Sequence, residues 1–245
     1  MGDIEIKVRT CPHCGQRLVP RVLEVPLAEG APVSMQMGWY DCQCAGAAAQ
    51  RQREEQQRRA WAATGTEEQR RAALIAAGIP TRYWQAELSR KLKDHVAGGL
   101  WLWGDASRGK THQACAIGRL WLARGRRVKF STMLALSSQM RATWGARGES
   151  EESVLDAYLS CDLLILDDLG TEHLDGRVLD ELFRLVDGRY GRRGTTIVTS
   201  NWRPQALAAR IAEKSDDVMA EKVVARLVEM CPPFEWVDRD WRLGR

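Results

Sequence analysis

The chain has 245 residues, of which 44% are hydrophobic, and its 36 basic and 32 acidic residues give a formal net charge of +4. This length accommodates one α/β domain of ordinary size and a small accessory module. The charge is mild for a dedicated nucleic-acid binder, and no stretch approaches the roughly 18 consecutive apolar residues of a membrane span. Because residues 1–10 also lack a signal-peptide pattern, we expect a cytoplasmic protein with no membrane partner.

The first region, residues 1–46, contains a β-like run, Arg21–Leu27, and two pairs of cysteines. The CxxC and CxC pairs are Cys11, Cys14, Cys42 and Cys44. Four thiolates suffice for one tetrahedral Zn²⁺ site, and a metal would supply the folding free energy that so small a core lacks. A ligand set with His13, a redox pair and unligated thiols are the alternatives, although no thioredoxin-like βαβ pattern surrounds Cys11.

Residues 47–77 form the second region, which is rich in Ala, Gln, Arg and Glu and predicts a helical linker. Its charges suit either a solvated connector or an arm that touches a partner or DNA. Gly78-Ile79-Pro80 ends the helix, because proline lacks an amide hydrogen and restricts the residue before it. A third region, residues 78–245, begins here. Three isolated cysteines lie in or beside its apolar runs and are expected to be buried and inert: Cys115, Cys161 and Cys231.

Apolar runs and helical periodicities alternate through this third region. The expected strands are Leu100–Trp103, Val128–Phe130, Leu163–Asp167, Thr195–Thr199 and Phe234–Val237. The expected helices lie around Tyr83–His95, Lys110–Ala123, Met133–Thr143, Ser150–Leu159, Asp175–Tyr190 and within 204–230. This alternation predicts an α/β fold with a mainly parallel sheet flanked by helices on both faces.

A phosphate-binding loop follows the first of these strands. The segment fits G-x-x-x-x-G-K-[ST] and consists of Gly104, Asp105, Ala106, Ser107, Arg108, Gly109, Lys110 and Thr111. Its glycines let the backbone wrap around phosphate oxygens, and the helix N-terminus offers them positive potential. Lys110 would hold the β- and γ-phosphates of ATP, and the Thr111 hydroxyl would bind Mg²⁺.

The expected strand that begins at Leu163 ends in two carboxylates, at the side of the sheet where nucleotides bind in such folds. Asp167 would orient the Mg²⁺ shell, and Asp168 would polarise the attacking water as a general base. A plain pair of strand-capping acids is the alternative. The next strand has a polar tip, where Asn201 could hydrogen-bond the water or the γ-phosphate.

At these residues the chain resembles a known family. Gly109–His112, Leu163–Gly170 and Thr199–Asn201 are similar to the Walker A, Walker B and sensor 1 motifs of AAA+ ATPases in the DnaC/DnaI helicase-loader group and of the related IstB-like transposition helpers. The resemblance covers Gly78 to Arg242. It implies a P-loop NTPase fold of the AAA+ type and an ATPase that uses ATP and Mg²⁺, with His112 included in the nucleotide site.

The same resemblance assigns two arginines near the end of the chain. Arg226 matches the arginine finger, and Arg242 matches the sensor 2-like arginine. An arginine from a neighbouring subunit stabilises charge on the leaving phosphates, so Arg226 would make hydrolysis depend on a homo-oligomer. Surface positions without a role in catalysis are the alternative for both.

Three residues depart from the family pattern. Ser107 replaces the usual glycine, Arg108 stands where small residues are common, and Asp168 is shorter than the usual glutamate. The first two departures bear on the geometry of the loop. The shorter acid suits slow hydrolysis, which a protein that holds a ring-shaped partner and releases it once tolerates.

The resemblance implies a replicative DNA helicase and single-stranded DNA as partners, with the N-terminal zinc module gripping the helicase. An IstB-like transposition helper and a non-hydrolysing adaptor are the alternatives. Two basic clusters could contact a phosphate backbone or merely compensate helix C-termini: Arg119, Arg124, Arg126, Arg127 and Lys129, and Arg189, Arg192 and Arg193. Of the ten tryptophans, three are expected in the core, Trp101, Trp103 and Trp121, and three are open candidates for base stacking, Trp61, Trp144 and Trp202.

Overall fold

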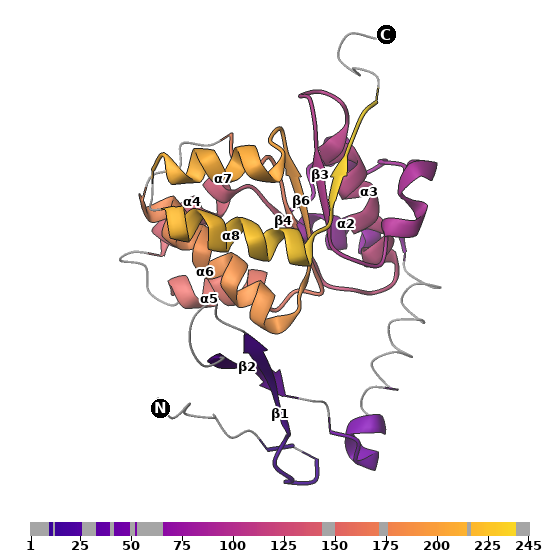
Figure 1. Ribbon diagram of the computed structural model, residues 1–245. Coiled ribbons are helices and arrows are strands. Elements are labelled where there is room, and N and C mark those ends of the chain that lie inside the picture. Colours follow the sequence, from indigo (N-terminus) through magenta and orange to yellow (C-terminus); the bar gives the residue numbers. More distant parts are fainter. Residues whose placement is uncertain are drawn as a thin grey trace. The chain divides into compact units, whose positions relative to one another are not determined.

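The computed structural model in Figure 1 describes residues 10–11, 13–25, 33–39, 42–49, 52, 66–143, 150–171, 176–214 and 217–238. The chain divides into two units, Met1–Ala63 and Thr64–Arg245. The predicted division into a module at 1–46, a linker at 47–77 and an ATPase domain at 78–245 remains a prediction. No helix in the described part of the chain combines the length and the hydropathy that crossing a bilayer requires.

The first unit is built on a β-hairpin. Strand β1 (Pro20–Val25) pairs antiparallel with β2 (Val33–Trp39), with a register shift between Arg21 and Val22. An isolated bridge joins Thr10 to Arg17 ahead of the hairpin, and residues 45–49 are helical after it. Cys11 and Cys14 lie in the bridged segment, and Cys42 and Cys44 lie between the hairpin and the helical residues, so the two cysteine pairs flank the hairpin.

The second unit contains a five-stranded sheet in the order β4-β5-β6-β3-β7, and every pairing in it is parallel. Its strands are β3 (Leu100–Trp103), β4 (Val128–Ser131), β5 (Leu163–Leu166), β6 (Thr195–Ser200) and β7 (Pro233–Glu235). All five were predicted to within one or two residues. Strand β6 separates β3, which precedes the phosphate loop, from β5, which precedes the two aspartates.

Helices cover both faces of this sheet, as Figure 1 shows. One face carries α2 (Glu67–Ala77) and α3 (Lys110–Ala123). The other face carries α4 (Met133–Ala142), α5 (Glu151–Leu159), α6 (Gly176–Arg192), α7 (Pro204–Ala212) and α8 (Asp217–Met230). Helix α2 begins with a capping box of Thr66 and Gln69, and it ends at Gly78 in the left-handed conformation.

The predicted helix around Tyr83–His95 is instead two short 3₁₀ helices, Thr81–Tyr83 and Arg90–His95. Between them the backbone amides of Glu87 and Ser89 donate to the side chains of His112 and Gln113 on α3. These tertiary hydrogen bonds replace the intrahelical ones, because an amide hydrogen that points at α3 cannot also close a helical turn.

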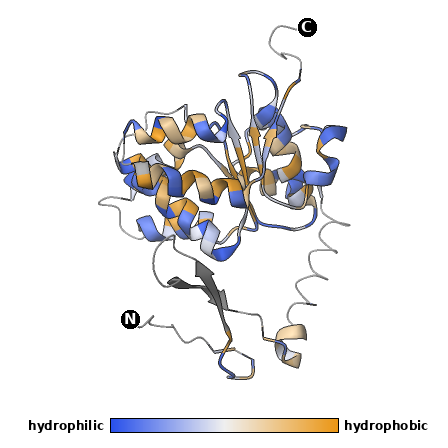
Figure 2. Ribbon diagram, in the orientation of Figure 1, coloured by the Kyte–Doolittle hydropathy of each residue, from blue (hydrophilic) through white to orange (hydrophobic). Residues whose placement is uncertain are grey.

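Alternation along the strands builds two apolar layers. Leu100 and Leu102 pack in the layer under α2 and α3, whereas Trp101 packs in the layer under α4–α8. Figure 2 shows the apolar strands between helices whose outer faces are hydrophilic. The three isolated cysteines are buried as predicted, with at most 6% exposure: Cys115, Cys161 and Cys231. Trp101 is also fully buried, and Trp103 and Trp121 are half-buried, as expected for packing residues.

Candidate nucleotide site and cysteine cluster

The polar residues that follow the three central strands meet where the carboxyl ends of these strands lie. Because β3, β5 and β6 are parallel neighbours, their carboxyl ends place the phosphate loop, the two aspartates and Asn201 side by side. Crevices outside the carboxyl ends of strands are where ligands bind in open α/β sheets. The sequence predicted this convergence correctly.

The phosphate loop depends on backbone conformations that favour glycine. Gly104 has a φ of 140° and Gly109 a φ of 88°, and an added Cβ at Gly104 would lie 2.7 Å from the carbonyl oxygen of Trp236. Ser107 has a φ of 64°, so it occupies the left-handed region without being glycine. Ser107 therefore bears backbone strain at the position where the sequence resemblance leads us to expect glycine.

The back of the loop is attached to the last strand. Buried Trp236 donates its indole N–H to the carbonyl of Arg108 at 2.7 Å, and its backbone amide donates to Trp103 at 2.7 Å. The guanidinium of Arg108 reaches the carbonyl of Asp238 at 3.0 Å and the carboxylate of Asp105 at 3.5 Å. The sequence did not indicate this role for Trp236, because it follows from the pairing of β7 with β3, 130 residues apart in the chain.

Lys110 is the charged centre of the loop. Its Nζ donates to the carbonyls of Gly104 and Asp105 at 2.8 and 2.6 Å and to Oδ1 of Asn201 at 2.8 Å. Burial lowers the pKa of the Lys110 ammonium, and the carboxylates of Asp168, Asp105 and Asp167 oppose that effect. Asn201, which the sequence placed as a sensor, therefore touches the lysine of the phosphate loop directly.

A single hydroxyl organises both aspartates. Thr199 Oγ1 donates to Asp167 Oδ1 at 2.6 Å and accepts from the backbone amide of Asp168 at 2.9 Å. Asp167 is 8% exposed, and burial raises its pKa while hydrogen bonds from Thr199 and Thr111 lower it. Asp168 is exposed, with a φ of 57° that turns its carboxylate away from the strand. The sequence analysis named Thr199 only as part of the sensor 1 motif. Its position, as a polar residue near the end of an apolar strand, was the signal that could have indicated its role beside the aspartates.

Thr111 and Asp167 lie together, as two ligands of one Mg²⁺ would. The Thr111 hydroxyl is close enough to Asp167 to lower the pKa of its carboxyl. Burial raises the pKa of the neighbouring Tyr83 phenol, and the Thr111 hydroxyl opposes that effect. His112 accepts from the amide of Glu87 at 3.2 Å and meets the Tyr83 ring edge-on, so its ring anchors the chain before β3.

The other predicted site residues have different surroundings. Asp105 and Ala106 are exposed at the tip of the loop. Arg226, on α8, forms an ion pair with Asp187 on α6 at 2.6 Å and lies over the rings of Phe183 and Tyr190. It is therefore held within its own subunit by α6. Arg242, Trp61 and Trp144 lie outside the described residues.

The four N-terminal cysteines form one cluster in the first unit. Their Sγ atoms all lie within 4.8 Å of one another, with Cys11 3.8 Å from Cys44 and Cys14 3.6 Å from Cys42. A tetrahedral ion with Zn–S bonds of about 2.3 Å requires sulfur separations of about 3.8 Å. The residues therefore fit Zn²⁺. His13 does not belong to this cluster; its Cβ instead lies 2.8 Å from where a Cβ on Gly46 would be.

Backbone amides point at three of the four cysteine sulfurs. Amides of His13, Cys44 and Ala47 point at the sulfurs of Cys11, Cys42 and Cys44 at 3.4, 3.5 and 3.4 Å. The amide of His13 is the main cause that lowers the pKa of Cys11 to about 6. The amides of Gln16 and Cys44 act in the same direction on Cys14 and Cys42, but burial and neighbouring thiols outweigh them, raising the pKa of Cys14 to about 12 and also raising that of Cys42. Thiolate is the form that ligates a metal.

Comparison with known proteins decides the family. Residues 90–243, more than half of the chain, match the family described as IstB-like ATP binding protein. The chain belongs to this family. The predicted resemblance is thereby confirmed, and this IstB-like ATP-binding protein has its phosphate loop, aspartates and Asn201 within the matched residues.

Two relatives represent the two branches of the resemblance. A protein of Sinorhizobium fredii named as an insertion sequence ATP-binding protein, y4uH, is 33% identical over 151 residues, 58% of each chain. The replicative helicase loader DnaC of Escherichia coli K12 is 30% identical over 118 residues, 47% of each chain. The IstB-like protein thus spans about half the length of the curated relatives it matches.

Solved structures agree on the fold. The crystal structure of the DnaC helicase loader superposes with a TM-score of 0.55 and 22% identity, covering 64% of this chain and 100% of that one. The crystal structure of DnaI gives 0.52 and 22%, covering 68% and 94%. The predicted α/β, AAA+ fold with a parallel sheet and flanking helices is confirmed, and the cysteine cluster is consistent with the predicted zinc module.

Proposed function

We propose that this protein is a Mg²⁺-dependent ATPase that loads a replicative DNA helicase onto single-stranded DNA and switches on ATP binding and hydrolysis. The observation that carries this proposal is the connected set of hydrogen bonds from Lys110 through Asn201 and from Thr199 to both aspartates. Groups suited to phosphate, metal and water lie at one edge of the sheet, in a family that binds ATP.

Each residue then has a defined task. The amides of the loop hold the phosphates of ATP, and Lys110 exchanges its loop carbonyls for the β- and γ-phosphates. Thr111 and Asp167 would hold Mg²⁺, which would supply positive charge opposite the phosphates. Asp168 orients and deprotonates the attacking water; its carboxylate accepts no hydrogen bond from the residues within the described ranges, so both oxygens are available.

The Lys110–Asn201 hydrogen bond supplies a route from nucleotide to subunit contacts. A γ-phosphate competes with Asn201 for the lysine, and Asn201 leads through Trp202 and Arg203 into α7. Helix α7 packs on α8, which carries Arg226. ATP binding thus biases the position of the arginine that we assign as the finger to a neighbouring subunit, as in other nucleotide switches. We assign Arg242 the sensor 2-like role.

We assign the N-terminal module, residues 1–46, to helicase binding. Zn²⁺ at the four cysteines would hold together a two-stranded hairpin, which is too small to form a sizeable core of its own. Residues 47–77 link this module to the ATPase domain at 78–245.

A second candidate is a helper ATPase that prepares target DNA for a transposase. The observation that favours it is the insertion sequence protein y4uH, which matches at higher identity and over more residues than DnaC does. The separate cysteine module favours the loader. A non-hydrolysing adaptor is a third reading, which Asp168→Asn tests: partner function that survives loss of hydrolysis supports it.

The deciding experiment is retention of the replicative helicase from the same organism, with ATP and with ADP. The full chain is compared with the chain lacking residues 1–46 and with Asp168→Asn. Retention that requires residues 1–46 and changes with the nucleotide supports the loader. If the full chain retains no helicase in either nucleotide, the loader proposal is wrong and the transposase helper takes its place.

A further inference from the structure

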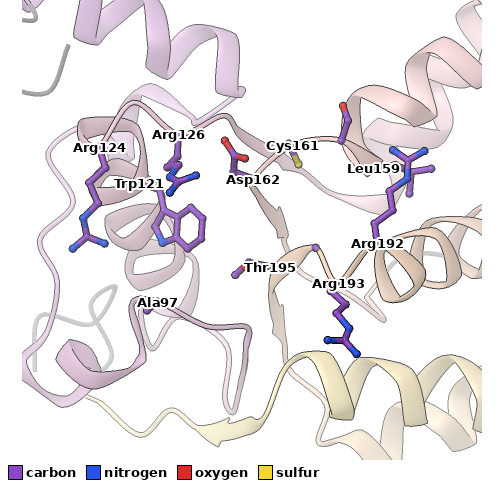
Figure 3. Close-up of a pocket in the computed structure, with 12 residues that line it drawn as sticks. Ala97, Trp121, Arg124, Arg126, Leu159, Cys161, Asp162, Arg192, Arg193 and Thr195 are labelled. Atoms are coloured by element: carbon purple, nitrogen blue, oxygen red, sulfur yellow. The ribbon is translucent and has the colours of Figure 1, made fainter. Parts of the chain in front are cut away.

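A cavity of about 550 Å³ lies at the opposite ends of the strands from the phosphate loop (Figure 3). Three segments far apart in the sequence line most of it: the end of α3 at 121–126, the chain entering β5 at 159–162, and the turn from α6 into β6 at 192–195. Because the strands are parallel, this cavity is formed at their amino ends. It therefore shares no residue with the nucleotide site.

The charge of the cavity is strongly positive. It is lined by one carboxylate, Asp162, and by four arginines: Arg124, Arg126, Arg192 and Arg193. Arg192 pairs with Asp156 at 2.9 Å, and Asp162 is engaged by the amide of Arg127 at 2.8 Å. The side chains of Arg124, Arg126 and Arg193 make no hydrogen bond or ion pair to any residue that the structure describes. Three cations thus face a concave surface without counter-ions from that part of the chain.

A buried arginine adds a further charge beneath this surface. Arg189 is 1% exposed, and its guanidinium donates to the carbonyls of Cys161 at 2.7 Å and Tyr158 at 3.3 Å and to that of Thr195. Its hydrogen-bond partners among the described residues are carbonyls, a hydroxyl and a thiol, and none of these is a carboxylate. Burial lowers the pKa of Arg189. The same bonds fix the Cys161 and Thr195 segments that form the cavity wall.

Arg193 occupies a backbone position that arginine does not favour. Its φ is 52°, in the left-handed position after α6 where glycine is usual. The following residue, Gly194, cannot exchange places with it, because a Cβ there would lie 2.5 Å from the guanidinium carbon of Arg189. A strained residue that also presents an unpaired cation to a cavity points to a functional role for the side chain.

Charge compensation at helix ends does not account for the cluster. It explains Arg124 and Arg192, which lie at the ends of α3 and α6. Arg126 and Arg193 lie beyond those helices, yet they face the same cavity. Figure 3 shows the Trp121 ring beside Arg126, with Arg192 and Arg193 across the cavity. The Trp121 indole N–H donates to the carbonyl of Val96 at 2.7 Å, which fixes the ring.

We propose that this cavity is a second phosphate-binding site, which holds the phosphodiester backbone of a single-stranded nucleic acid. Arg124 and Arg126 lie on one side of the cavity and Arg192 and Arg193 on the other (Figure 3), so a strand that crosses the cavity meets both pairs. The half-buried Trp121 ring, beside Arg126, offers a base an aromatic surface within the cavity. The inference extends the proposed function, and it concerns contacts that the nucleotide site does not make.

The test uses the full chain with Arg126→Gln, Arg193→Gly, the double variant and a control, Arg90→Gln. Arg90 is an exposed arginine outside the cavity, so its loss changes the net charge by as much as either single variant does. Glycine suits the φ of residue 193, so thermal unfolding of Arg193→Gly should be unchanged or shifted upward. Binding of a labelled oligo-dT is followed by fluorescence anisotropy over a series of salt concentrations.

Each lost phosphate contact should weaken binding about five-fold at 0.1 M salt and reduce the slope of log K against log salt by about 0.7. The double variant should therefore bind about 25-fold more weakly, with ATP affinity unchanged. Affinity and slope equal to those of Arg90→Gln would overturn the proposal.

A free nucleotide is the other source of phosphate. If Lys110→Ala protein binds ATP, and the double variant removes that binding, the site takes a nucleotide and the assignment to a strand is wrong. The helicase-retention experiment uses neither arginine variant, so failure of the cavity proposal is distinguishable from failure of the loader proposal.

Discussion

Replacing Ser107 with glycine should stabilise the protein, although the residue lies within the phosphate loop. The half-buried Ser107 side chain makes no hydrogen bond to the residues that the structure describes, and its φ is 64°. An L-residue in this conformation costs about 1–2 kcal/mol. Glycine removes that cost but adds about 0.4–1 kcal/mol of conformational entropy to the unfolded chain.

The difference is a net gain in the free energy of unfolding of about 0.5–1 kcal/mol. For a domain of this size, that gain corresponds to a rise in the melting temperature of about 1–4 °C. Thermal unfolding followed by circular dichroism without nucleotide measures it.

Ser107→Ala is the matched control. Alanine removes the same hydroxyl but keeps the Cβ, so it retains the strain and should leave the melting temperature unchanged. A lower melting temperature for Ser107→Gly, or an equal rise for Ser107→Ala, would refute the argument from backbone strain.

Three further changes test the rest of the site. Burial raises the pKa of Asp167, so the folded state binds its proton more tightly than the unfolded chain and loses stability as pH rises through the interval between the two pKa values. Asp167→Asn should therefore raise the melting temperature at neutral pH while abolishing Mg²⁺-dependent phosphate release; a lower melting temperature would contradict this. Trp236→Phe removes the hydrogen bond to Arg108 and should weaken ATP binding about 5- to 10-fold by calorimetry, the effect of one lost bond of about 1–1.4 kcal/mol. Removing Zn²⁺ with a chelator, or changing Cys44 to Ser, should unfold residues 1–46 in hydrogen-exchange measurements and leave ATP binding unchanged; unaltered exchange would refute a metal role.

The nucleotide site was predictable because its signals are local. The loop motif adjoins an apolar strand, and the alternating burial of Leu100, Trp101 and Leu102 follows from the period of two in a strand. The parallel order then requires the carboxyl ends of neighbouring strands to meet. Lys110 and Asn201 are 91 residues apart, yet each was assigned from its own strand end.

Other features depend on contacts that no local pattern encodes. The sequence grouped Arg189 with Arg192 and Arg193, but the structure buries it. Helical spacing held the signal, because Leu182, Leu185 and Arg189 recur on one face of α6 at intervals of three and four. The role of Trp236, by contrast, depends on β7 pairing with β3, and the sequence carries no mark of that pairing.

Strand β6 fixes the distance between the phosphate loop, at the carboxyl ends of the strands, and the arginine cavity, at their amino ends. Thr195 lines the arginine cavity, Asn201 follows the other end of the strand, and six residues of β structure span about 20 Å. Neighbouring strands hydrogen-bond β6 on both sides, so it can neither stretch nor slide. A change at the phosphate loop should therefore reach the far end of β6 through rigid movement of the covering helices, which makes the helical layers, and not the sheet, the parts of this IstB-like ATP-binding protein that we expect to move.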